Sequence, residues 1–111
     1  MTSTEAVAQI EGLPGSELVT AGLADAAAGR VTVPACLVWI ALPRLRRAGL
    51  LSEGHAPAIK EPELTLYRLL RGESDAAFSR YNSLLRRLVS FERALDQQMR
   101  KTALGLHPSD G

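Results

Sequence analysis

The chain has 111 residues, of which 46% are hydrophobic and 23% are charged, and its formal net charge is +1. A domain of this size buries about two-thirds of the surface that its unfolded chain exposes. This is enough for one hydrophobic core that needs no disulfide bond or metal ion for stability. The composition excludes a fibrous repeat, a disulfide scaffold and a wholly disordered chain. The near-zero charge gives no strong overall attraction for nucleic acid or membranes. We expect one domain over 1–111, with loose tails at 1–3 and 103–111.

The cysteine content and the N-terminal sequence favour a cytoplasmic location. The single Cys36 cannot form an intramolecular disulfide, which fits a reducing compartment. The first twenty residues contain three acids and no Lys or Arg, unlike a secretory signal. The longest apolar run, Val31–Leu42, has 12 residues, whereas a membrane-spanning helix needs about 20. The sequence therefore predicts no contact with a membrane.

The residue types favour an all-α fold. Leu, Ala, Arg, Glu and Lys together supply 55 of the 111 residues, against only 9 Val plus Ile. Arginine is strongly preferred to lysine, with 11 Arg and 2 Lys. This preference reflects either the base composition of the genome or selection for planar recognition of phosphate or carboxylate groups.

Capping and breaking residues divide the chain into helices. Thr4, Ser16, Thr32 and Ser74 are good N-caps, and Gly29, Gly49 and Gly72 are good stops. Pro43 is expected to kink or end the third helix, and Pro62 to open the fourth. The helices are predicted over 4–11, 17–28, 32–48, 63–71 and 75–102, with a loop over 50–62.

The third helix is expected to be the central one. Ala35–Leu42 is apolar on every side, and Trp39, the only tryptophan, should anchor the core. The preceding helix, 17–28, is rich in alanine and carries Gly22, so it can approach a neighbour closely. The predicted architecture is a single bundle-like domain of four to five helices with one long C-terminal amphipathic helix.

The long helix over 75–102 is longer than its domain. It would measure about 40 Å, against a diameter of about 26 Å for a compact domain of this size. Either it frays, or a second copy covers part of its apolar side. That side spans a wide arc that includes Phe78, Leu85, Val89 and Met99. The candidate interaction face within it comprises Tyr81, Leu84, Leu88, Phe91 and Leu95.

Two acids, Glu92 and Asp96, lie one helical turn apart on the apolar arc. Paired carboxylates on a half-buried face can bind a metal or perform acid–base chemistry. The favoured interpretation is a set of structural ion pairs, because a buried charge must find a partner. The candidate partners are Arg44, Arg46, Arg47, Arg68 and Arg71.

Arginines recur on the polar side of the same helix. Arg86, Arg93 and Arg100 are spaced by seven residues, and Arg80 and Arg87 form a second, shorter row. Such a ridge can track a phosphate backbone. No aromatic residue lies among these arginines to stack on a base, and a solvated helix face explains them equally well.

Catalytic and metal-binding patterns are scarce. One cysteine and two histidines cannot complete a tetrahedral zinc site. His55 and His107 fall in predicted loop or tail segments, and no glycine-rich phosphate loop or nucleophile elbow is present. The sequence predicts no cofactor, no metal and no catalytic residue, and the protein is not expected to be an enzyme.

Three functions compete on this evidence. The favoured hypothesis is a non-enzymatic helical module that forms homo-oligomers, most simply a homodimer, or docks another protein. The alternative is a small bacterial nucleic-acid-binding regulator, such as an antitoxin-like component, that uses the arginine ridge. A third hypothesis is an enzyme that uses Glu92 and Asp96 with nearby arginines.

Overall fold

The computed structural model describes residues 8–50 and 59–103, and the fold is all-α, as predicted. No strand occurs in these two ranges. Residues 8–10 are helical, which agrees with the predicted first helix, and the rest of that prediction lies outside the described residues, as do 1–3, 104–111, His55 and His107. Five longer helices follow: α2 Ser16–Ala27, α3 Val33–Ile40, α4 Leu42–Arg47, α5 Pro62–Glu73 and α6 Ala77–Ala103.

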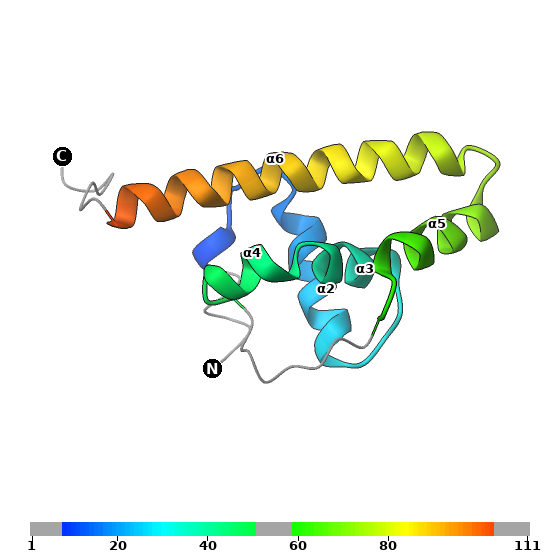
Figure 1. Cartoon of the computed structure of the whole chain (residues 1–111), viewed down its shortest axis with the longest axis horizontal. Helices are drawn as coiled ribbons and strands as arrows, with labels where there is room; N and C mark the ends of the chain where they lie inside the picture. The colour runs from blue at the N-terminus through cyan, green and yellow to red at the C-terminus, as the bar shows by residue number, and fades with distance from the viewer. Residues whose placement is uncertain (1–7, 51–58, 104–111) are drawn as a thin grey trace.

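Helix α6 runs along one side of the molecule, and the other helices lie on the opposite side (Figure 1). It has 27 residues and is therefore about 40 Å long, in a molecule that measures 49 by 29 by 19 Å. The helix is continuous from Ala77 to Ala103. None of the described helices combines the length and apolarity that a bilayer crossing requires.

Helix α3 is the centre of the core, as its uniformly apolar sequence predicts. Residues 35–39 are all buried. The Thr32 hydroxyl accepts a hydrogen bond from Ala35 N at 3.2 Å and caps the helix, with Pro34 in its first turn. The helix ends at Ala41, and α4 restarts with Pro43 in its own first turn, where the missing N–H costs nothing.

Helices α2 and α3 cross closely at Gly22. A Cβ atom at this position would lie 2.3 Å from the Pro34 carbonyl oxygen and 2.5 Å from Val38 Cγ2. Both distances are far inside van der Waals contact, so only glycine permits this crossing. The lack of a side chain at Gly22 therefore lets the backbones of α2 and α3 come together.

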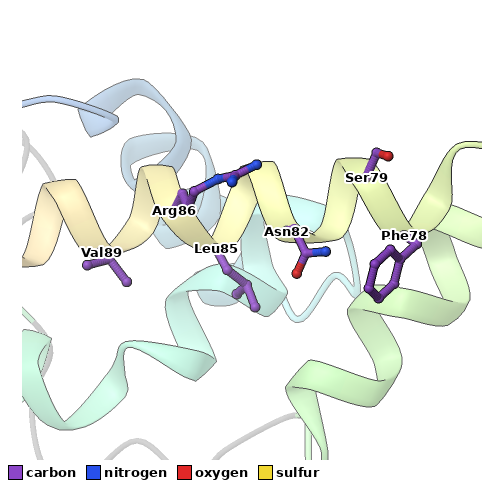
Figure 2. Close-up of a pocket in the computed structure, with 6 residues that line it drawn as sticks. All are labelled: Phe78, Ser79, Asn82, Leu85, Arg86 and Val89. Atoms are coloured by element: carbon purple, nitrogen blue, oxygen red, sulfur yellow. The ribbon is translucent and has the colours of Figure 1, made fainter.

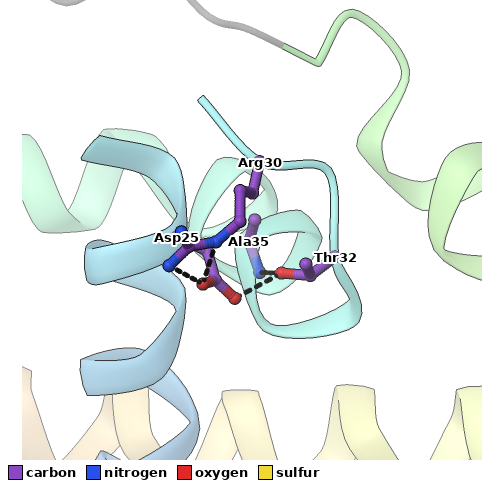
Figure 3. A network of polar contacts seen from close by, with 4 residues as sticks. All are labelled: Asp25, Arg30, Thr32 and Ala35. Atoms are coloured by element: carbon purple, nitrogen blue, oxygen red, sulfur yellow. Dashed lines mark hydrogen bonds and ion pairs between the residues drawn. The ribbon is translucent and has the colours of Figure 1, made fainter. Parts of the chain in front are cut away.

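The turn between these two helices is held by a polar network (Figure 3). Asp25 accepts hydrogen bonds from Thr32 Oγ1 at 2.6 Å and from Arg30 Nε at 3.0 Å. The Thr32 hydrogen bond, followed by that of Arg30, lowers the pKa of Asp25 below its usual value. Thr32 thus donates to α2 while it caps α3, which fixes the angle between them.

Three predicted helix boundaries were wrong: the start of α2, the end of α5, and the start of α6, which begins at Ala77 rather than at residue 75, so that Ser74 ends α5 instead of capping α6. Gly15, with φ of 76°, is the N-cap of α2, and Ser16 is the first residue inside the helix. A Cβ at Gly15 would lie 3.2 Å from the Arg87 carbonyl oxygen, so glycine serves both the left-handed cap and the contact with α6. Helix α5 continues through Gly72 and ends when Ser74 becomes extended.

We expect Gly22→Ala to lower the free energy of unfolding by about 1–3 kcal/mol, because the added methyl group forces α2 away from α3. The matched control is Gly72→Ala, since a Cβ there meets nothing within 4 Å and the backbone is already helical. That variant should be unchanged or up to about 1 kcal/mol more stable. Urea unfolding followed by circular dichroism measures both. Equal stabilities for the two variants would contradict the close crossing.

Candidate functional site

The apolar arc of α6 is divided between the core and the surface. Leu88, Phe91 and Leu95 are buried inside the chain, and Tyr81 and Leu84 are half-buried. The face predicted to be available to a partner is thus largely occupied by the chain's own core. The reason is that α6 lies on the other helices through this side, which the helical periodicity alone could not distinguish from the rest of the arc.

The adjacent side of α6 carries the exposed apolar surface. Phe78, Asn82, Leu85 and Val89, here called the α6 stripe, project from the same side of the helix (Figure 2). Phe78 is 67% exposed and Val89 is 42% exposed. The stripe borders a shallow open groove of about 390 Å³, whose other lining residues are Ser79 and Arg86. Exposed aromatic and branched side chains in a continuous row are typical of a binding surface.

Helix α5 extends this surface beside Phe78. A second groove, of about 350 Å³, is lined by Glu63, Leu64, Tyr67, Phe78 and Tyr81. Leu64 is 42% exposed. The Tyr67 and Tyr81 rings stack edge to face with centroids 5.6 Å apart, which joins α5 to α6. Phe78 therefore lies where the two grooves meet.

Arg44 of α4 contacts both carboxylates that interrupt the apolar arc. It donates a hydrogen bond to Asp96 and lies 3.8 Å from Glu92. Burial raises the pKa of Glu92, and the positive charge of Arg44 only partly offsets this effect. Of the five candidate arginines, the structure thus brings Arg44 to the pair. This arrangement anchors the C-terminal half of α6 on α4.

The predicted arginine ridge divides into two groups. Arg80 forms an ion pair with Glu73 at 2.9 Å, and Arg87 forms one with Glu17 of α2. Arg86, Arg93 and Arg100 are exposed and form no ion pair with any other described residue. Of the three arginines without an ion pair to another described residue, Arg86 lines the groove beside the α6 stripe, whereas Arg80 and Arg87 hold neighbouring elements together.

Other reactive groups are few in this part of the chain. Cys36 is fully buried in α3, and its burial raises the pKa of the thiol, which disfavours the reactive thiolate. Among residues 8–50 and 59–103, no group of three or more His, Cys, Asp or Glu side chains is arranged to hold a metal ion.

Comparison of the chain with known protein families, with curated proteins and with solved structures gives no match.

The α6 stripe was missed at the level of sequence, although its residues were visible there. Phe78, Leu85 and Val89 belong to the wide apolar arc, and Asn82 lies between them on the helix. Their 4-3-4 spacing does not separate these four positions from the buried row, because Tyr81, Leu84, Leu88, Phe91 and Leu95 follow the same alternation of three and four residues.

We expect the Glu92→Gln variant and the wild type to have the same free energy of unfolding below pH 4.5. As the pH rises above this value, the variant should become more stable than the wild type. A pKa raised in the folded state means that folding favours the protonated carboxyl, so ionisation of Glu92 lowers stability. At pH 7 the free energies of unfolding of the variant and the wild type should differ by about 1 kcal/mol or less. The measurement is the free energy of unfolding from pH 4 to pH 7.

The control is Glu63→Gln, because Glu63 is an exposed residue of α5. A Glu92→Gln variant that is less stable than the wild type at neutral pH would show that attraction to Arg44 outweighs the effect of burial.

Proposed function

We propose that this protein is a non-enzymatic helical interaction module that docks an apolar helix of another protein chain along the α6 stripe. The observation that carries the proposal is the exposure of Phe78 and Val89 at the two ends of one row of a helix, with the half-buried Leu85 between them, whereas the other apolar row of the helix already belongs to the core. When a partner covers exposed apolar surface, its removal from water stabilises the complex by about 25 cal/mol per Å² buried. The stripe thus gives a favourable driving force for association.

A helix is the occupant that best fits this surface. The stripe advances by four, three and four residues, which is the repeat that lets side chains of one helix enter the spaces between those of another. From Phe78 to Val89 it extends about 16 Å along the axis of α6. The groove beside it follows the same helix, so an aligned helix could contact all four positions.

The enzymatic alternative has less support. Glu92 and Asp96 are both engaged by Arg44, so they are not free to exchange protons with a substrate. Of the described residues that line the groove on the α6 stripe, Arg86 is the one ionisable side chain. An apolar surface with a single cation is suited to recognition rather than to acid–base chemistry.

The nucleic-acid alternative depends on Arg86, Arg93 and Arg100. If these three arginines contact phosphates, a plot of log affinity against log salt concentration should have a slope of about −3 for duplex DNA. Fluorescence anisotropy with labelled DNA and RNA at two or more salt concentrations tests this. Arg86→Glu with Arg100→Glu should then abolish binding. Docking of a protein helix predicts no binding of either nucleic acid even at low salt.

The main prediction concerns Phe78→Ser combined with Val89→Ser. Both side chains are largely exposed, so the unfolding free energy should stay within about 1 kcal/mol of the wild type. Association with another polypeptide, whether a second copy or a protein captured from nuclease-treated lysate of the source organism, should be lost. Sedimentation velocity and affinity capture measure the two cases.

The matched control is Val31→Ser, because Val31 is 51% exposed but lies in the turn before α3. This variant should retain the association of the wild type. If the double variant and the wild type associate equally with every partner found, the α6 stripe is not the docking surface.

A further inference from the structure

We infer that the helix docked on the α6 stripe carries an arginine whose guanidinium binds in the groove between α5 and α6. The inference rests on the proposed function and specifies the chemistry of its partner. This groove, here called the aromatic groove, has a volume of about 350 Å³ and is lined by Glu63, Leu64, Tyr67, Phe78 and Tyr81. It contains both tyrosines of the chain and one of its two phenylalanines.

Three aromatic rings form the walls of the aromatic groove. The Tyr67 and Tyr81 rings are nearly perpendicular, with an angle of 88° between their planes. Phe78 precedes Tyr81 by three residues on α6, so the two share one side of that helix, and Figure 2 shows the Phe78 ring on the α5 side of α6. The face of each ring carries partial negative charge, so rings at different angles can attract one cation from more than one direction.

Glu63 is the one charged residue among the described residues that line the aromatic groove. It is exposed and forms no ion pair with another described residue. The positions three and four residues ahead on α5 are Leu66 and Tyr67, so its own helix supplies no cation there. A carboxylate beside three ring faces attracts a positive group and repels phosphate. Charge complementarity therefore favours a positively charged occupant.

The shape of the aromatic groove favours a guanidinium over an ammonium group. A guanidinium is planar, stacks on a ring face and can donate two parallel hydrogen bonds to a carboxylate, whereas a lysine ammonium is compact and strongly hydrated. Leu64 is 42% exposed and offers apolar surface to the methylene groups of an arginine side chain. Arginine thus matches the rings, the carboxylate and the apolar surface together.

Phe78 belongs to both the α6 stripe and the aromatic groove. A helix aligned on the stripe therefore has one end beside Phe78, where an arginine in its last turn can extend towards Glu63. The α6 stripe itself is mainly apolar and gives little preference for the direction in which the partner helix runs. An ion pair at one end supplies that preference, because only one direction brings the arginine to Glu63.

The first experiment titrates the full chain with Nα-acetyl-arginine amide and follows the aromatic proton resonances by NMR. We expect saturable shifts of Tyr67, Phe78 and Tyr81 with a Kd on the order of 10 mM, because one exposed ion pair and one cation–π contact bind weakly. The uncharged citrulline analogue should bind at least about 10-fold more weakly, and the lysine analogue about 3-fold more weakly. Equal binding of either analogue, or no saturation by the arginine probe, overturns the inference.

The second experiment separates the charge from the rings. Glu63→Gln and Phe78→Leu should each weaken binding of the arginine probe about 3-fold, and Phe78→Trp should strengthen it, because indole is the best cation–π partner. The matched control is Glu61→Gln, since Glu61 is exposed, makes no side-chain capping hydrogen bond and does not line the aromatic groove. Circular dichroism verifies that each variant is folded. Unchanged binding by Glu63→Gln overturns the inference.

Val89→Ser keeps this test separate from the test of the proposed function. Val89 does not line the aromatic groove, so this variant should bind the arginine probe as the wild type does. If the probe fails to bind while Phe78→Ser with Val89→Ser still abolishes association, the inference is wrong and the proposed function stands. If the probe binds but the double variant keeps every association, the proposed function is wrong, and with it the assignment of the arginine to a docked helix.

Discussion

The close approach of α2 and α3 at Gly22 sets the geometry on which the other helices depend. The Pro34 carbonyl and the Val38 side chain fill the space that a Cβ would need, so the two backbones are held nearly in contact. Asp25 and Thr32 fix the turn that joins them. Helix α3 is thereby placed with its central residues fully covered. Because α3 is apolar on every side, it offers α5 and α6 a surface on which to pack.

Helix α6 has more apolar surface than these helices cover. Its buried row, Leu88, Phe91 and Leu95, completes the core, whereas Phe78 and Val89 in the neighbouring row remain exposed to solvent and Leu85 between them is half-buried. Burial of one side fixes the helix in place, and the exposed side then forms a straight, rigid surface. A rigid surface loses little conformational entropy when a partner binds, which favours association even over a small area.

Ion pairs add to the contacts that hold α6 on the other helices. Arg44 contacts Glu92 and Asp96 near one end, and Glu17 contacts Arg87 near the middle. Each of these pairs joins residues that are distant in the sequence, so each constrains the rotation of α6 about its own axis. Exposed pairs of this kind contribute little stability individually. Together with the buried row of α6, they help to set which side chains of the helix, such as Phe78 and Val89, stay exposed.

Local signals in the sequence were enough to identify the all-α class, the central helix and the start of α3. Caps, glycine stops and helical periodicity act within one or two turns, so they can be read without knowledge of the remaining chain. The capping role of Thr32 and the burial of Trp39 follow directly from such signals. The arc on α6 was also visible, as was the need of Glu92 and Asp96 for a positive partner.

The remaining features depend on contacts between residues far apart in the chain. Gly15 takes the place of Ser16 as the cap of α2, and α6 lies against it, with the Arg87 carbonyl oxygen 3.2 Å from the position of a Cβ. Five arginines were equally suitable for Glu92 and Asp96 until α4 brought Arg44 beside them. Helical periodicity defines the width of an apolar arc, but the positions of the neighbouring helices determine which part is buried and which part stays exposed.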